Sequence, residues 1–289
     1  MHSTHRHRTL LCAALVAFGL SQALGFQSVH KEITRTREKA LRAVLDVSFG
    51  SIYIERGSKD KIVVIDYDED SDVKDKFQVS YEIKDDEGRL RIRLKKTSRV
   101  WGDDESDNAD HRKLKLRFSD EIPISFNVEL GAGRGDLNMS GLLVKDIKIS
   151  TGASSVEMRC DKPNGIAAQN IEIESGVSKF TATNLCNTNF RKLKFSGGVG
   201  AYKLDFGGSL KQDANANIEV GLGSVSVSIP KSMPTRLLYD AGFFSSFDLD
   251  DDFEKQRSGV YETEDYKGGD SKLTIQIESG LGSVKVRRK

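Results

Sequence analysis

The chain has 289 residues, and its length, composition and charge exclude several classes of protein. Hydrophobic residues make up 37% and charged residues 30%, which is too apolar and too evenly charged for intrinsic disorder. The 44 basic and 43 acidic side chains leave a net charge of +1, so no global field favours nucleic acid or an anionic membrane. Only 3 cysteines and 5 histidines exclude a disulfide-dense scaffold and make a zinc site difficult to build.

Residues 1–25 have the pattern of a cleavable secretory signal peptide. A short basic segment, Met1–Thr9, precedes an uncharged apolar run, Leu10–Leu20, and small residues follow at Ala23 and Gly25. The alternative is a membrane anchor, but a spanning helix needs about 20 apolar residues. No later run has that length, so we expect an exported protein, periplasmic, extracellular or on the cell surface, with no transmembrane segment in its mature part.

The region 26–110 is predicted to be rich in β-strands. Apolar and polar residues alternate over Leu41–Phe49, which is typical of a half-buried strand. The segment His30–Arg42 could be a helix or an extended lead-in, because its charges alternate in sign but its apolar stripe is thin. Asp85–Gly88 suits a hairpin turn, and the acidic segment Trp101–Asp110 predicts an exposed loop. The same alternation recurs at Lys61–Tyr67, Phe77–Ile83, Leu90–Leu94 and Leu114–Phe118.

The strongest feature of the region 111–289 is an internal repeat. Lines of the form apolar-x-apolar-x-x-Gly-x-small-x-apolar-x-apolar recur, as in IKISTGASSVEM from Ile147 and IEVGLGSVSVSI from Ile218. Successive marker glycines are separated by 21, 24, 21, 24, 21 and 38 residues, and the last interval contains an insertion. The marker glycines are Gly131, Gly152, Gly176, Gly197, Gly221, Gly242 and Gly280, and Gly50 marks an earlier copy.

A period in the low twenties made of short strands is typical of a β-solenoid. Each repeat would supply two strands around a narrow core, and neighbouring coils must stack because one coil cannot bury its apolar face. Glycine suits the bends because it tolerates positive φ and lets chains approach closely. The alternative is an antiparallel sandwich with glycine bulges, which gives no reason for the spacings to recur. We predict an all-β fold, a solenoid continuous with the N-terminal β-strand region, in which the Gly280 repeat is the last coil.

The repeats resemble the bacterial toast-rack family. The resemblance is carried by VELGAGRGDLNMSGLLVKDIKISTGASSVEMRCDKPN from Val128, by FSGGVGAYKLDFGG from Phe195 and by the C-terminal run from Ser258. It covers nearly all of the chain after residue 25, and it implies a β-helix-like fold and an envelope location. It also implies a relation to the C-terminal domain of LiaF-type cell-wall-antibiotic response proteins. The membrane helices of LiaF-type proteins are not found in this sequence, so control of a sensor kinase from within the membrane is not implied.

Candidate metal sites fail on their spacing. The acidic runs Asp66–Asp72 and Asp248–Asp252 imitate the start of a calcium loop, but neither has glycine at position 6 and glutamate at position 12. The histidines after residue 25 are His30 and His111, which form no metal-binding motif. We therefore predict no metal site and no cofactor.

Cys160 and Cys186 are the cysteines that follow the predicted leader, and an exported protein meets an oxidising environment. They lie in consecutive repeats, 8 residues after Gly152 and 10 after Gly176, so stacking could bring them together as a disulfide. Two separate buried thiols are the alternative, because Pro163 reshapes the turn between them.

Two functions from different classes fit these patterns. The first is a secreted, non-enzymatic protein that binds or scaffolds an envelope protein or a cell-wall component, in the envelope or cell-wall stress response. The second is a carbohydrate-active β-helix enzyme of the polysaccharide lyase kind, which needs metal-binding acids and a base in one groove. The acidic clusters, however, fall in predicted loops rather than at a repeated strand offset. No G-x-S-x-G elbow occurs, and Ser178 and Ser224 have no base nearby in sequence, so we predict no catalytic residue and favour the first function.

Overall fold

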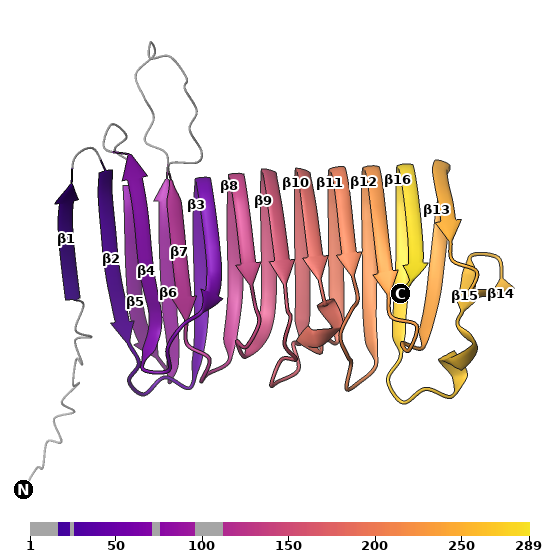
Figure 1. Ribbon diagram of the computed structural model, residues 1–289, viewed down its shortest axis with the longest axis horizontal. Coiled ribbons are helices and arrows are strands. Elements are labelled where there is room, and N and C mark those ends of the chain that lie inside the picture. Colours follow the sequence, from indigo (N-terminus) through magenta and orange to yellow (C-terminus); the bar gives the residue numbers. More distant parts are fainter. Residues whose placement is uncertain (1–16, 24–25, 71–75, 96–111) are drawn as a thin grey trace, which may run out of the picture.

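The computed structural model of the protein describes residues 17–23, 26–70, 76–95 and 112–289. These residues are almost entirely β, with two 3₁₀ turns, η2 (Leu185–Thr188) and η3 (Glu264–Lys267), and no α-helix. The strands form one open sheet of 16, in the order β1-β2-β4-β7-β3-β8-β9-β10-β11-β12-β16-β13-β15-β14, with β6 and β5 branching from β3 (Figure 1). Most of the predicted leader and the predicted loop Trp101–Asp110 lie outside the described residues, while residues 17–23 of the leader form β1.

The strands fall into an N-terminal group and a repeat group. The first group is β1 (Ala17–Ala23), β2 (Phe26–Thr34), β3 (Ala40–Arg56), β4 (Lys61–Asp70), β5 (Lys76–Lys84), β6 (Glu87–Lys95) and β7 (Lys113–Phe118). The second group is β8 (Ile124–Asn138), β9 (Val144–Arg159), β10 (Asn170–Thr183), β11 (Lys192–Asp205), β12 (Ala214–Ile229), β13 (Thr235–Leu249), β14 (Glu254–Arg257), β15 (Val260–Glu262) and β16 (Leu273–Arg288).

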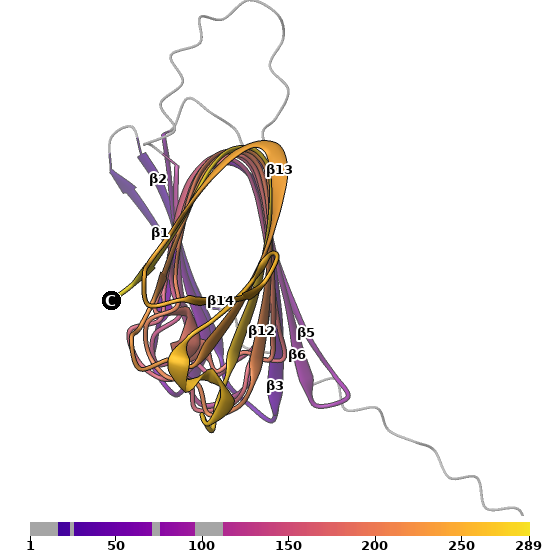
Figure 2. The same ribbon diagram turned by 90° about the vertical axis from the view of Figure 1, so that its right-hand side faces the viewer.

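Each repeat is one long bent strand, not the two separate strands that we expected. The eight bent strands, β3, β8 to β13 and β16, have 14 to 17 residues and pair in parallel with their neighbours. Figure 2 shows that these strands arch over at one end of the cross-section and are joined by loops at the other. The burial pattern of β12 locates the bend. The buried side chains are Ala216, Ile218 and Val220 before the bend and Val225 and Val227 after it. The alternation slips by one residue at the bend, so both halves of the strand face the same interior.

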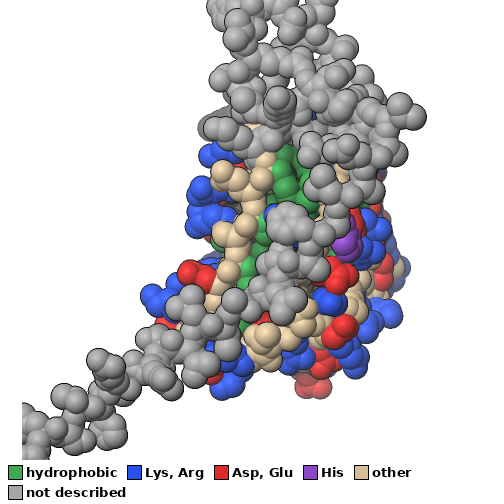
Figure 3. Space-filling model, turned by 90° about the vertical axis from the view of Figure 1, so that its left-hand side faces the viewer, with side chains coloured by type: hydrophobic (Ala, Val, Ile, Leu, Met, Phe, Trp, Pro, Cys, Tyr) green, Lys and Arg blue, Asp and Glu red, His purple; other side chains and the backbone are tan. Residues whose placement is uncertain are grey.

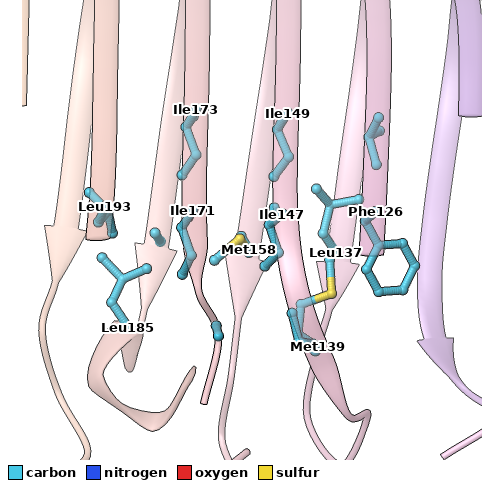
Figure 4. Packing of buried hydrophobic residues seen from close by; sticks show 14 of the residues in the cluster. Phe126, Leu137, Met139, Ile147, Ile149, Met158, Ile171, Ile173, Leu185 and Leu193 are labelled. Atoms are coloured by element: carbon cyan, nitrogen blue, oxygen red, sulfur yellow. The ribbon is translucent and has the colours of Figure 1, made fainter. Parts of the chain in front are cut away.

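The core consists of columns of apolar side chains from neighbouring strands. Ile147 pairs with Ile171, which in turn pairs with Leu193, and Ile149 pairs with Ile173 one layer nearer the bend (Figure 4). These side chains are at most 3% exposed. Since a fully buried aliphatic side chain contributes about 1.5–3 kcal/mol, the stacked columns are the main source of stability.

The N-terminal region continues the same sheet. The first half of β3 pairs with β6 and its second half with β7, both in parallel, so β6 and β7 together occupy the place of one bent strand. The predicted hairpin forms between β5 and β6, where Asp85 and Asp86 both adopt positive φ, as a type I′ turn requires. The ambiguous segment His30–Arg42 is extended and contains the end of β2 and the start of β3.

The two ends of the stack are closed differently. At the N-terminal end a band of hydrophobic side chains is visible between walls of charged residues (Figure 3). There Lys31 of β2 places its ammonium 5.9 Å from the ring centroid of Phe77 on β5. At the C-terminal end β14, β15 and η3 follow β13, and Phe253 and Tyr266 are buried there.

The Gly280 repeat is not the last coil, so that expectation is wrong. Its strand, β16, pairs in parallel with β12 on one side and with β13 on the other. The insertion before β16 explains the difference: it forms β14, β15 and η3 beyond β13, and the chain then returns to place its last strand inside the stack.

Candidate functional site

The bent strands turn along one line, which we call the crest. The crest carries a column of glycines that we call the glycine floor: Gly131, Gly152, Gly176, Gly198, Gly221 and Gly280. The pairs Ser175–Gly197 and Val177–Val199 place Gly198 opposite Gly176, so the floor position of β11 is one residue later than the marker glycine of the sequence pattern. Gly50 pairs with Gly133 and therefore belongs to a second column, two residues beyond the floor.

Close approach of neighbouring strands requires these glycines. A Cβ on Gly280 would lie 2.6 Å from the carbonyl oxygen of Gly221, and one on Gly152 would overlap the carbonyl oxygen of Gly131. In the second column, Gly223 has a φ of 137°, and a Cβ there would overlap the carbonyl oxygen of Gly200. Side chains are therefore excluded at the positions of the glycine floor and of the second column.

A row of carboxylates runs beside the glycine floor. These residues, which we call the acidic row, share one register position on consecutive strands, with Ser150 and Ser196 filling the two remaining places. The acidic row is Asp46, Glu129, Glu174, Glu219, Glu278 and Asp240. We expected the acidic clusters to fall in loops rather than at a repeated strand offset. Single acids do recur at one strand offset, and Asp66–Asp70 of the first cluster lie in β4, so that expectation is wrong in both respects. The sequence carries a signal for this row, because five of the six acids stand two residues before a floor or marker glycine.

A line of exposed aliphatic side chains runs along the other side of the glycine floor. It consists of Val177, Val199, Leu222 and Leu281, which pair with one another in register on β10, β11, β12 and β16, and we call it the aliphatic ridge. Their exposed fractions are 66%, 45%, 46% and 49%. In the part of the chain that the structure describes, these four are the exposed large hydrophobic residues, so all of them gather in one line.

Two depressions that meet at Ser196 lie between the acidic row and the crest, and we call them together the crest groove. Their volumes are about 590 and 790 Å³. Their walls are carboxylates, hydroxyls and glycine backbone, and the described residues that line them include no lysine, arginine, histidine or cysteine. The groove therefore offers negative charge and hydrogen-bond acceptors, and the aliphatic ridge runs one residue beyond its glycine floor.

The negative charge of the acidic row is only partly compensated. Lys148 lies 4.0 Å from Glu174 and Lys194 lies 3.7 Å from Glu219, in half-exposed ion pairs that are worth little in water. Glu219, Glu278 and Asp240 stand directly opposite one another on β12, β16 and β13. Like charges in such positions destabilise a sheet, so this end of the row favours a cationic ligand.

The serines and histidines considered in the sequence do not form a catalytic centre with the described residues of this groove. The Ser178 hydroxyl bonds that of Ser175, and Ser224 is exposed at the crest without a base among the described groove residues. The Nδ1 atom of His30 lies 2.6 Å from Asp66 in the N-terminal region, whereas His111 lies outside the described residues. No cluster of three metal-binding side chains occurs within the described ranges.

Cys160 and Cys186 are free, buried thiols in the structure. The Cys160 thiol donates to the carbonyl oxygen of Lys162 at 3.3 Å. Burial, and to a lesser degree Asp161, raises the pKa of Cys160 to about 12, and burial raises the pKa of Cys186 as well. The thiolate forms are therefore disfavoured in the folded state, which makes both groups slow to react.

Comparison with solved structures finds matches at low sequence identity. A candidate cell adhesion protein from Clostridium sporogenes is 17% identical, with a TM-score of 0.51 over 91% of this chain and 100% of its own. A candidate adhesin from Bacteroides fragilis is 12% identical, with a TM-score of 0.36 over 90% of this chain and 96% of its own. No match was found among curated proteins.

Two further findings concern membrane-spanning helices and the family of the chain. None of the helices in the described residues has the length and apolar character needed to cross a membrane. The family model described as the N-terminal domain of toast_rack, DUF2154, matches residues 24–182 and again residues 164–228. Together these stretches span more than half of the sequence, and the chain belongs to the toast-rack family.

Proposed function

We propose that the protein is a non-enzymatic binding protein of the cell envelope and that the crest groove is its binding surface. The observation that carries this proposal is the register of the strands, which places the acidic row two residues before the glycine floor and the exposed aliphatic ridge one residue after it. Single exposed aliphatic side chains scattered over a surface are normal, whereas a contiguous line of them marks an interaction surface. The basic and apolar pattern of residues 1–25 supports export, and the name of the Clostridium sporogenes protein is compatible with a role at the cell surface.

The fold that supports this surface is proposed to be a β-solenoid with coils of 21 to 24 residues. The parallel, in-register pairing from β3 to β13 and the glycines at each bend support this interpretation. The pairing of β3 with β6, β7 and β8 supports a single domain that contains both the N-terminal strands and the repeats. A rigid stack of this kind suits binding, because it holds the groove straight along its length.

A polysaccharide lyase is a weaker candidate. That chemistry needs a base to remove a proton beside a carboxylate that metal or a cation neutralises. The acidic row supplies carboxylates, but the described residues that line the groove include no lysine, arginine or histidine that could serve as the base or the cation. The arrangement therefore favours binding over bond cleavage.

The proposal is tested by offering the purified protein separate envelope fractions: insoluble cell wall, membrane vesicles and soluble polysaccharides. Co-sedimentation or gel retardation measures binding, and the appearance of new chain ends measures turnover. We expect binding to at least one fraction, loss of that binding in V199S/L222S, and no turnover. Turnover that disappears when the acidic row is neutralised, or binding that the ridge substitutions leave unchanged, would contradict the proposal.

A further inference from the structure

We propose that the crest groove binds an extended polypeptide segment in which cationic and apolar side chains alternate. This inference rests on the proposed function, since it names the partner chemistry of the same groove. Cationic side chains of the ligand would face the acidic row, and its apolar side chains would face the aliphatic ridge.

The length of the groove fits a short extended segment. The acidic row crosses eight neighbouring strands, from β3 to β13. At about 4.8 Å between strands the row is about 34 Å long, which an extended chain covers with about ten residues. Successive side chains of an extended chain point to opposite sides. A segment lying along the groove therefore directs one set of side chains to the carboxylates and the other set to the opposite side, where the ridge covers the four strands β10, β11, β12 and β16.

Charge complementarity selects a cationic partner. The groove lining holds the carboxylates of the acidic row, and the basic residues beside them, such as Lys148 and Lys194, stand farther from the crest on β9 and β11, where serine takes the place in the row. Three carboxylates, Glu219, Glu278 and Asp240, are adjacent on β12, β16 and β13. Lysine or arginine side chains placed over them would relieve their mutual repulsion and gain charge-assisted hydrogen bonds.

The aliphatic ridge selects an amphipathic partner over a purely charged one. Val177, Val199, Leu222 and Leu281 expose between 45% and 66% of their surface to water. Covering them with apolar side chains removes that surface from water, which a chain of lysines alone cannot do. The six glycines of the floor line the two depressions, so the main chain of the ligand can lie close to the crest.

The test uses a synthetic peptide of about ten residues in which lysine and valine alternate, a length set by the groove. A block peptide of the same composition, with all lysines first and all valines after, is the ligand control. Two groove variants are E219Q/E278Q/D240N, which removes three charges, and V199S/L222S, which makes the ridge polar. The matched control is E82Q/E157Q/D251N, which removes three exposed charges outside the groove.

We expect the alternating peptide to bind the natural chain at least about tenfold more tightly than the block peptide, a difference of about 1.4 kcal/mol. Each groove variant should weaken that binding by at least about tenfold, the control variant should not change it, and added salt should weaken it. Equal binding of both peptides, or equal binding by E219Q/E278Q/D240N, would overturn the inference. So would a ridge that is covered by a second copy of the chain, seen as a dimer that V199S/L222S dissociates.

Failure of this inference differs from failure of the proposed function. If an envelope fraction binds through the groove while the alternating peptide does not, the groove is a binding surface for another chemistry and only the present inference falls. If neither the fractions nor the peptide respond to the groove variants, both fall.

Discussion

Replacement of Gly223 by alanine tests the packing of the crest most directly. Gly223 lies in β12 between Gly200 of β11 and Gly282 of β16, and its φ of 137° is one that L-residues rarely adopt. A Cβ at this position would also overlap the carbonyl oxygen of Gly200. The substitution therefore combines backbone strain with a clash against the backbone of the neighbouring strand, which cannot move aside as a side chain could.

Both effects can be given a magnitude. Backbone strain in a sparsely populated φ region costs about 1–3 kcal/mol, and overpacking costs a further 1–3 kcal/mol. The loss of freedom in the unfolded chain returns only about 0.4–1 kcal/mol. We expect G223A to lower the free energy of unfolding by about 2–5 kcal/mol, a large part of the 5–15 kcal/mol typical of a folded protein.

The assay is denaturant unfolding followed by circular dichroism, with two graded controls. G268A should be nearly neutral, because no atom lies within 4 Å of the Cβ it would add. G176A should be intermediate, because its Cβ would lie 3.2 Å from the carbonyl oxygens of Thr151 and Gly152 and its φ is not positive. G282A should be as severe as G223A, since β16 is an inner strand. A G223A midpoint equal to that of G268A would refute the strand packing described here.

Three further predictions address other parts of the molecule. Labelling of Cys160 and Cys186 should be slow in the folded protein, because burial raises both thiol pKa values. Thiols are then counted after denaturation without reductant. Two free thiols would exclude a disulfide between these residues, and none would establish it. Burial favours the protonated form of Glu38, but hydrogen bonds from its own amide and from Thr36 outweigh burial and lower the pKa of this carboxyl group. The ionised Glu38 side chain therefore stabilises the fold above about pH 4.5, and this stabilisation is lost as the pH falls. E38Q should therefore be less stable than the natural chain at neutral pH and equal to it in acid, as measured by denaturant midpoints at both pH values. S226C/K285C should form a disulfide because these positions face each other on the neighbouring strands β12 and β16. A cysteine pair from β12 and β13 should not, because β16 lies between those strands. Mass spectrometry of the digested chain detects either disulfide.

The features that the sequence predicts correctly are those that depend on neighbouring residues. Alternation over Leu41–Phe49 and the turn at Asp85–Gly88 fix strands and a hairpin locally, because side chains of a strand alternate between two faces and positive φ is confined to few residue types. The family resemblance was also correct, since it relied on the repeated glycine lines. The division into two strands per repeat failed, because whether a chain breaks or bends at a glycine is decided by how the next strand packs.

The features that were missed depend on contacts between distant segments. The position of β16 between β12 and β13 follows from where the insertion leads the chain, and repeat spacing carries no information about that path. The sequence alone does not tell which glycine of the pair Gly197-Gly198 occupies the floor position, because the register with β10 decides it. The order β12, β16, β13 places Glu278 rather than Asp240 in the middle of the three adjacent carboxylates, and the order of the repeats does not reveal this.

The residues of the crest divide into those that the fold requires and those that it does not. The glycines are required, because neighbouring backbones occupy the space of any side chain. The aliphatic ridge is different: Leu222 and Val199 are about half exposed, so they gain little from packing. Their replacement by serine should change the free energy of unfolding by no more than about 0.5 kcal/mol, as for surface substitutions elsewhere. Denaturant midpoints of V199S and L222S measure this change. A loss of several kcal/mol would mean that the ridge packs within the fold, whereas a neutral result together with lost binding would assign it to the ligand.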